Sequence, residues 1–183
     1  MVDHIVVTEG LAYVEEQGTM KCCLSDYFEA VLDQVIQTVP ANESVFISPA
    51  NHFGCKLSEE EYATEYLLTK RPDLKVYVPS DVRDRAYLDT FDNARLLRTW
   101  LQKQGLWPLG DVILYCNAPH SFRSWLLFRL CGFNIQQVIG CRPEKVYKKI
   151  VPRLWYYDYF TIQILYEILG TLYDFVRWFL GGK

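Results

Sequence analysis

The sequence lacks most of the short motifs that identify common enzyme classes. It contains no Gly-x-Gly-x-x-Gly, which argues against a standard NAD-binding turn. It contains no Gly-x-Ser-x-Gly, and no serine or cysteine precedes a histidine in the order typical of hydrolases, which argues against a serine hydrolase elbow. No Cys-x-x-Cys pair occurs, so a structural zinc site is not predicted. No long run of like charges and no internal repeat is present either.

The cysteines and the amino terminus bear on the compartment. The first residues show no basic region followed by an apolar stretch, so we expect no signal peptide. The six cysteines are not spaced like a disulfide framework, because two are adjacent and the others are scattered. We therefore expect reduced, mostly buried thiols in a cytoplasmic protein. These cysteines are Cys22, Cys23, Cys55, Cys116, Cys131 and Cys141.

The composition is that of a globular protein. A chain of 183 residues, half of them hydrophobic, can form one domain with an appendage. The net charge of −3 argues against a nucleic-acid surface. We expect an α/β domain over residues 1–150 and an aromatic helical extension over residues 151–183.

Strands and helices alternate along residues 1–150. Short β-branched runs predict five strands, and apolar residues at helical spacing predict four helices between or after them. This alternation predicts a Rossmann-like three-layer sandwich with a mostly parallel sheet. The expected strands are residues 4–8, 44–48, 74–78, 111–116 and 135–139. The expected helices are residues 25–39, 58–70, 89–104 and 124–131.

The carboxyl-terminal segment has a different pattern. Residues 160–180 form an apolar helix with one narrow polar stripe, and aromatic residues precede it. We consider three environments: a helix packed against the sheet, a homodimer interface over residues 155–180, and a membrane surface. The charges in the stripe argue against a transmembrane span. The stripe consists of Gln163, Glu167, Thr171, Asp174 and Arg177.

The turn at residues 117–123 is the strongest site candidate. It joins an apolar strand to a helix, which places Asn117, His120 and Arg123 where open α/β sheets bind ligands. An imidazole suits proton transfer near neutral pH, so His120 is our candidate acid/base group. The guanidinium of Arg123 can clamp a phosphate or carboxylate. The structural alternative is an ion pair between Arg123 and Glu59 or Asp89.

Other candidates lie after predicted strands or at predicted helix starts. Glu59 is a second catalytic candidate, which could orient His120, bind a ribose hydroxyl, or only favour the helix dipole. Thr90 and Asn93 are candidate ligand-binding residues, or alternatively a cap and a loop fastener. Glu9 and Gly10 follow the first strand and complete the candidate ligand-binding set.

Three further candidates have simpler interpretations. Glu9 with Asp81 and Asp84 could supply oxygen ligands to Mg²⁺ or Mn²⁺, but no spaced motif supports this, so no metal site is predicted. Cys116 ends a strand near His120 and is interpreted as a packing residue rather than a nucleophile. His52 is interpreted as a surface or lid residue.

Three segments in order resemble one family. They are Ser58-Glu59-Glu60-Glu61, then Asp89-Thr90-Phe91-Asp92-Asn93-Ala94, and then Ala118-Pro119-His120-Ser121-Phe122-Arg123 with a later Gly132-Phe133. Together they are similar to the YdcF/SanA/ElyC-like family of domains of unknown function, over about residues 3–142. The chain is a divergent member of this pattern, because the glycine cluster after the first strand is reduced to Gly10 and the second is replaced by a longer loop.

The resemblance implies a Rossmann-like fold and a nucleotide-like ligand, with S-adenosylmethionine among the candidates. It implies a role in envelope biogenesis for some members. Combined with the residues above, it predicts binding of a nucleotide-like or phosphorylated small molecule at the carboxyl edge of the sheet, with group-transfer or phosphoester chemistry if the protein is an enzyme. The alternative is a non-catalytic, envelope-associated protein that docks through its carboxyl-terminal helix.

Overall fold

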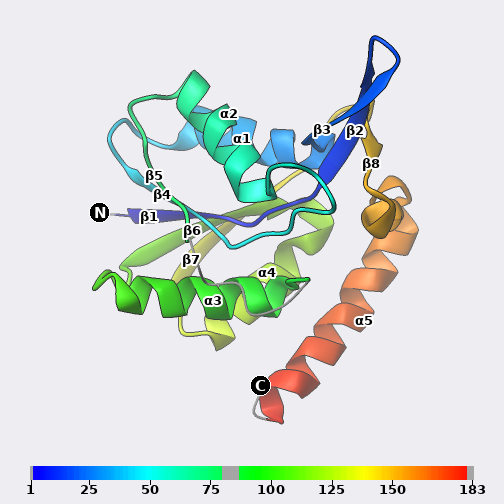
Figure 1. The fold of residues 1–183 in the computed structure, drawn as a ribbon. Coiled ribbons are helices and arrows are strands. Elements are labelled where there is room, and N and C mark those ends of the chain that lie inside the picture. Colours follow the sequence, from blue (N-terminus) through cyan, green and yellow to red (C-terminus); the bar gives the residue numbers. More distant parts are fainter. Residues whose placement is uncertain (1, 80–86, 181–183) are drawn as a thin grey trace.

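A parallel sheet forms the middle layer of the protein. The computed structural model, which describes residues 2–79 and 87–180, is a three-layer α/β fold (Figure 1). The sheet has the order β5-β4-β1-β6-β7, and every neighbouring pair is parallel. This confirms the Rossmann-like sandwich expected from the sequence. The strands are β1 (Val2–Val6), β4 (Ser44–Ile47), β5 (Lys75–Tyr77), β6 (Asp111–Asn117) and β7 (Ile135–Cys141).

Helices cover both faces of this sheet. Consecutive residues of a strand point to opposite faces of the sheet. Val6 therefore packs with the buried apolar side chains of α1 and α2, whereas Ile5 packs with those of α3 and α4. Both faces are therefore apolar, as parallel sheets require. The helices are α1 (Asp26–Thr38), α2 (Glu59–Lys70), α3 (Thr90–Lys103) and α4 (Ser121–Leu130).

The predicted helix signals are confirmed. Ser58 and Glu61 form a reciprocal capping box at the start of α2. The side chain of Asp89 caps α3 by accepting from the backbone N–H of Asp92 at 2.9 Å. Gly105 follows the end of α3 with φ at 68°, a conformation that glycine adopts without strain.

The order of the strands creates a switch point between β1 and β6. From β1 the chain passes outward to β4 and β5, and then returns to the other side of β1 to form β6 and β7. The connections that leave the carboxyl ends of β1 and β6 therefore turn in opposite directions and open a crevice. Glu9 follows β1 and His120 follows β6, so both lie at this crevice.

A small second sheet was not expected from the sequence. It is antiparallel, has the order β3-β2-β8, and consists of β2 (Leu11–Glu16), β3 (Thr19–Leu24) and β8 (Lys149–Ile150). Gln17 and Gly18 join β2 to β3 with φ at 51° and 75°, the positive values that a tight hairpin turn needs. Gln-Gly is a weaker hairpin signal than Asn-Gly, and half of the residues of β3 are exposed in one run, so neither the turn nor an alternating pattern was evident.

The hairpin changes the interpretation of two cysteines. Cys22 of β3 and Cys55 of the loop before α2 form a disulfide, so the expectation of six reduced thiols was wrong. The fold brings together two residues 33 positions apart, which spacing alone does not reveal. Among the free thiols, Cys116, Cys131 and Cys141 are buried, as expected. Disulfides persist mainly in oxidising compartments, so the cytoplasmic location stays a prediction.

Removing this disulfide is expected to destabilise the protein. Replacing Cys22 and Cys55 together with serine frees a loop of this length in the unfolded chain, which costs about 3 kcal/mol of unfolding free energy. Urea denaturation of the oxidised wild type and the double variant measures the difference. Cys131→Ser, which removes a free thiol, is the control, and it is expected to change the urea midpoint less. Equal midpoints for the double variant and the wild type would contradict the pairing.

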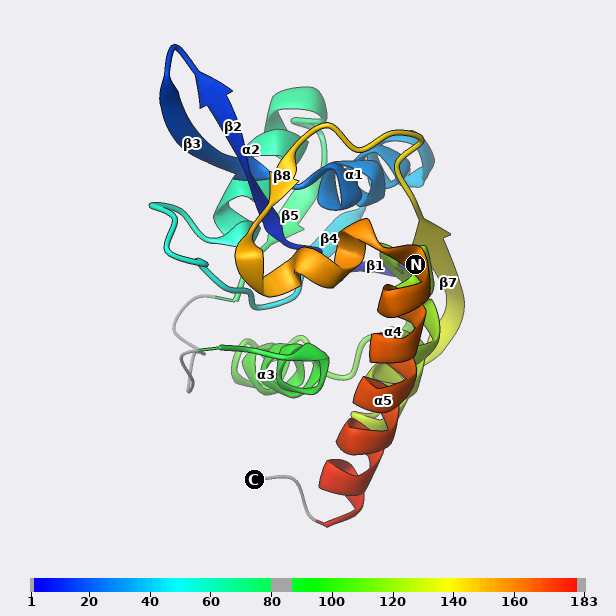
Figure 2. The ribbon, with the colours of Figure 1, turned by 90° about the vertical axis from the view of Figure 1, so that its right-hand side faces the viewer.

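The carboxyl-terminal segment lies along the edge of the domain. It consists of a 3₁₀ segment, η2 (Pro152–Asp158), and the long helix α5 (Phe160–Phe179). The helix packs mainly on α4 and on η1 (Ala118–His120), rather than on the sheet (Figure 2). Its buried residues are the polar ones, Gln163, Glu167 and Asp174. The polar stripe therefore faces the domain, and most apolar side chains of α5 face solvent.

Candidate functional site

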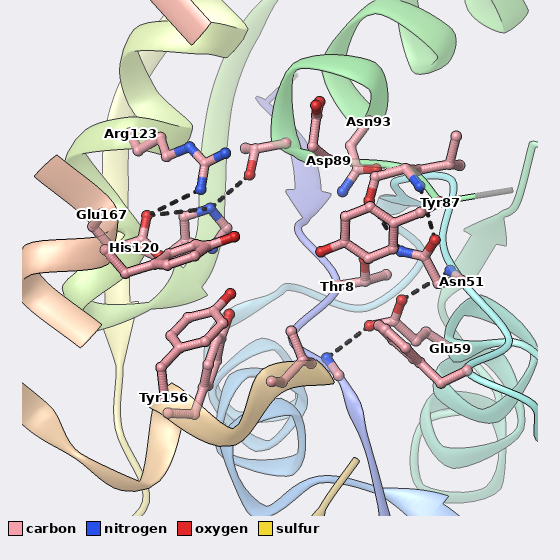
Figure 3. A pocket seen from close by; sticks show the side chains of 17 residues that line it. Thr8, Asn51, Glu59, Tyr87, Asp89, Asn93, His120, Arg123, Tyr156 and Glu167 are labelled. Atoms are coloured by element: carbon pink, nitrogen blue, oxygen red, sulfur yellow. Dashed lines mark hydrogen bonds and ion pairs between the residues drawn. The ribbon is translucent and has the colours of Figure 1, made fainter. Parts of the chain in front are cut away.

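A polar cavity lies at the switch point between β1 and β6. It encloses about 490 Å³ of empty space, its open mouth included. The domain supplies one wall and the segment η2–α5 supplies the other, so His120 and Glu167 face each other from different elements (Figure 3). The lining residues are Thr8, Gly10, Asn51, Phe53, Glu59, Tyr87, Leu88, Asp89, Thr90, Asn93, His120, Arg123, Leu154, Tyr156, Tyr157, Tyr166 and Glu167.

His120 is held between a carboxylate and a hydroxyl. Its Nδ1 lies 3.2 Å from Oε1 of Glu9, and its Nε2 lies 2.8 Å from Oγ1 of Thr90. Glu9 is fixed in turn by the backbone N–H of Asn117 and by the hydroxyl of Tyr157, which both donate to its carboxylate at 2.7 Å. A carboxylate, an imidazole and a hydroxyl in this order can orient a base and move a proton.

The charges around His120 favour its protonated form. Burial alone lowers the pKa of the imidazole, but the carboxylates of Glu167 and Glu9 outweigh it and raise the pKa above its ordinary value. Nε2 lies 3.9 Å from the Glu167 carboxylate. His120 therefore keeps its proton to a higher pH than an ordinary histidine does.

Arg123 is buried against carboxylates from α5. Its Nη2 and Nε lie 2.7 and 2.9 Å from Oδ2 of Asp174, and its Nη1 lies 3.5 Å from Oε2 of Glu167. Although burial opposes the charge, these carboxylates raise the pKa of Arg123 and keep it charged. A Cβ on Gly170 would lie only 3.0 Å from the guanidinium carbon, so glycine lets α5 approach this closely. The expected alternative partners, Glu59 and Asp89, are not the ones found.

Glu59 has a different role from the one expected. Its two carboxylate oxygens accept hydrogen bonds from the backbone N–H groups of Gly10 at 2.6 Å and Asn51 at 2.9 Å. The carboxylate that orients His120 is that of Glu9. Burial raises the pKa of Glu59 to about 8, in spite of the two backbone donors that lower it. Glu59 is therefore mostly protonated at neutral pH and can donate a hydrogen bond into the cavity.

Gly10 connects this carboxylate to the carboxyl-terminal segment. It has φ at 92°, which favours glycine, and a Cβ there would clash with the side chain of Leu154. Glycine is thus favoured at position 10 for two reasons, its positive φ and the close approach of the Leu154 side chain from η2.

The start of α3 completes the cavity. Asp89 caps the helix and also pairs with Arg177 of α5, with Oδ2 and Nη1 2.5 Å apart. The Asn93 amide, oriented so that its nitrogen donates, lies 3.0 Å from the carbonyl oxygens of Asp89 and Pro49. Thr90 contacts His120, whereas Asn93 fastens a loop, which was the structural alternative for that residue.

Six of the eight predicted site residues line the cavity together. They are Gly10, Glu59, Thr90, Asn93, His120 and Arg123. Glu9 and Asn117 lie behind the wall, and the buried side-chain amide of Asn117 has no hydrogen-bond partner within the described residues. These two residues position His120 rather than line the space for a ligand.

The remaining candidates are His52, Cys116 and the acidic residues considered for a metal. His52 is exposed, as a surface residue would be. Cys116 is fully buried, and this burial raises the pKa of its thiol well above the ordinary value, which supports a packing role. Asp81 and Asp84 lie outside the described residues. Within residues 2–79 and 87–180, no group of three or more His, Cys, Asp and Glu side chains has the arrangement of a metal site.

The sequence did not identify the contribution of the carboxyl-terminal segment. Glu167 and Asp174 reach the predicted site, and Tyr156, Tyr157 and Tyr166 form much of its wall. The available signal was the recurrence of polar residues along an apolar helix. The pattern did not indicate that this stripe supplies the carboxylates that pair with Arg123 and His120.

The comparisons with known proteins add no assignment. No protein-family model, no curated protein and no solved structure matches the chain. The resemblance to the YdcF/SanA/ElyC-like family therefore stays a prediction that rests on its three sequence segments.

Proposed function

We propose that the cavity binds a nucleotide-like or phosphorylated small molecule, with Arg123 as the anion clamp and His120 as the proton-transfer group. One observation carries this proposal. Two buried cationic groups at the switch point are matched with carboxylates of the chain itself, Glu167 and Asp174. Phosphate and carboxylate oxygens accept the same charge-assisted hydrogen bonds, so a ligand anion that takes the place of the Glu167 carboxylate can pair with both cationic groups.

The cavity wall offers further contacts to such a ligand. The amino terminus of α3 opens at the cavity, where its dipole favours a negative group. Protonated Glu59 can donate to a hydroxyl, such as that of a ribose. The side chains of Tyr87 and Tyr156 provide aromatic surface near the mouth of the cavity. These contacts suit a ligand with a phosphate at one end and a sugar or base at the other, as in a nucleotide. S-adenosylmethionine shares the sugar and the base with this class.

The His120 environment supports group-transfer or phosphoester chemistry. Glu9 fixes the ring and favours a proton on Nδ1, which leaves Nε2 as the position that exchanges a proton with a ligand. Thr90 occupies that position in the present structure. A ligand oxygen that replaces the Thr90 hydroxyl would receive or lose the proton at Nε2.

A ligand panel tests this proposal. Calorimetric titration and thermal unfolding with ADP, S-adenosylmethionine and inorganic phosphate measure binding to the wild type. A ligand at a hundredfold excess over its dissociation constant raises the unfolding free energy by about 2.7 kcal/mol. His120→Gln removes a charged hydrogen-bonding group, and we expect it to weaken binding roughly tenfold.

The control is His52→Gln, which makes the same substitution at an exposed residue outside the cavity. We expect it to bind each probe as the wild type does. The proposal fails if no probe binds the wild type, or if His120→Gln and His52→Gln bind every probe equally.

A further inference from the structure

The outer side of α5 is an exposed apolar face without charge. All of α5 is described, and none of its exposed residues is Asp, Glu, Lys or Arg. Apart from Thr161, every one of them is aliphatic or aromatic. We call this set the outer face of α5; it consists of Phe160, Ile162, Ile164, Leu165, Tyr166, Ile168, Leu169, Leu172, Tyr173, Phe175, Val176, Trp178 and Phe179.

Ion pairs with the domain fix the orientation of the helix. Glu167 and Asp174 pair with Arg123, and Arg177 pairs with Asp89 and with Asp92, the latter at 2.7 Å. Every charged residue of α5 is therefore used to hold the helix on the domain. Rotating the apolar side inward would break these pairs, so the outer face stays exposed as long as α5 is docked.

The width of the outer face argues for one kind of partner. At 3.6 residues per turn, its side chains spread over roughly 200° of the helix circumference. One helix–helix seam uses a stripe of only about 100°, so a second copy of α5 would leave much of the face in water. A helix that lies half-immersed in a bilayer buries an arc of this width.

The apolar surface also continues beyond α5. Phe122 at the start of α4 is 63% exposed and lines a shallow groove with Ile164, Ile168 and Leu172. One cationic group lies at the amino-terminal end of α5, where the guanidinium carbon of Arg142 stands 4.2 Å from the centre of the Phe160 ring. A positive group beside an apolar face is complementary to anionic phospholipid headgroups.

Aromatic residues mark both ends of the helix. Trp155 and Tyr159 precede α5 and Trp178 ends it, and all three are exposed. Tryptophan and tyrosine favour the headgroup region of a bilayer, where the ring is buried and the polar atom is wet. Figure 2 shows α5, η2 and β8 on the side of the molecule that faces the viewer.

We propose that the outer face of α5 docks on a lipid bilayer that contains anionic phospholipid, with the helix parallel to the surface. None of the described helices combines the length and the apolarity needed to cross a membrane. On its α5 side the ligand cavity is lined by Glu167, which is buried against the domain, and by Tyr166 at the border of the outer face. This inference is independent of the proposed ligand.

Vesicle flotation with the full chain tests this inference. We expect the wild type to float with vesicles of phosphatidylcholine and phosphatidylglycerol, and to bind vesicles of phosphatidylcholine alone more weakly. Leu165→Glu/Leu169→Glu places two charges on exposed positions of the outer face, so the fold is unaffected. We expect this variant to partition roughly a hundredfold less onto the mixed vesicles.

The matched control is Met20→Glu/Leu68→Glu, which makes the same kind of change at exposed residues of β3 and α2. It is expected to float like the wild type. The inference is overturned if the wild type stays unbound, or if both double variants float equally. It is also overturned if the wild type forms a stable dimer, by light scattering, that does not bind vesicles, because a second copy would then cover the face.

Discussion

Asp174→Ala is expected to lower the free energy of unfolding by about 3 kcal/mol. Asp174 is fully buried, and its Oδ2 accepts a hydrogen bond from Nε of the buried Arg123 and forms an ion pair with Nη2. Removing the carboxylate leaves a guanidinium in the interior, and among the described residues only the more distant Glu167 then lies within ion-pair distance of it. The uncompensated charge, rather than the lost contact, produces most of the cost. Urea denaturation measures the effect, and protease cleavage within α5 reports whether the helix leaves the domain.

Two further variants test whether the loss of stability comes from leaving a buried charge without its partner. Asp33→Ala breaks an ion pair with Lys70 in which both side chains are nearly half exposed, and we expect a change below about 1 kcal/mol. Arg123→Met/Asp174→Leu removes both buried charges, and we expect it to recover most of the stability lost in Asp174→Ala. If Asp174→Ala costs no more than Asp33→Ala, the pair does not hold α5 in place.

The fold could be predicted because its signals are local. Apolar runs bounded by capping residues such as Ser58 and Asp89 fix the order of strands and helices, and alternation of the two leaves few topologies. The hairpin of β2 and β3 was harder to predict, because its turn is Gln-Gly and half of its second strand is exposed. The disulfide between Cys22 and Cys55 depends on where that hairpin lies, so it was missed with it.

The part of the site that the parallel sheet positions could be predicted from the sequence. Glu9 follows β1, Thr90 is the first residue of α3, and His120 follows β6. A parallel sheet brings such positions to one edge. It could not be predicted that Glu9 rather than Glu59 orients His120. The position of each carboxylate depends on the backbone N–H groups that donate to it, which only the folded structure shows. The pairing of Glu167 with His120 requires the position of α5, which no local pattern supplies.

Glu167→Gln tests the link between α5 and the proposed ligand site. The carboxylate of Glu167 raises the pKa of His120 and occupies space that a ligand phosphate would need. The substitution keeps the shape of the side chain and removes its charge. We therefore expect a lower His120 pKa by NMR titration, and binding of ADP that is roughly tenfold tighter because an acidic neighbour no longer opposes the phosphate.

The same substitution should change the dependence of stability on pH. Because folding raises the pKa of His120 above 6.5, the stability it contributes is complete below pH 6.5 and is lost as pH rises through the folded value. Glu59, with its pKa raised from 4.5 to about 8, causes a further fall between those values in both proteins. The difference between wild type and Glu167→Gln therefore isolates His120, and the variant should lose less stability above pH 6.5.

Glu65→Gln is the matched control, since it makes the same change at an exposed position of α2. It should leave the His120 pKa, the affinity for ADP and the pH dependence unchanged. A His120 pKa in Glu167→Gln equal to that of the wild type would mean that the α5 carboxylate does not act on the imidazole. If ADP binds the wild type and binds Glu167→Gln no more tightly, then the ligand lies beside Glu167 rather than in its place. In that case the anion clamp would have to be sought at the start of α3 instead of at Arg123.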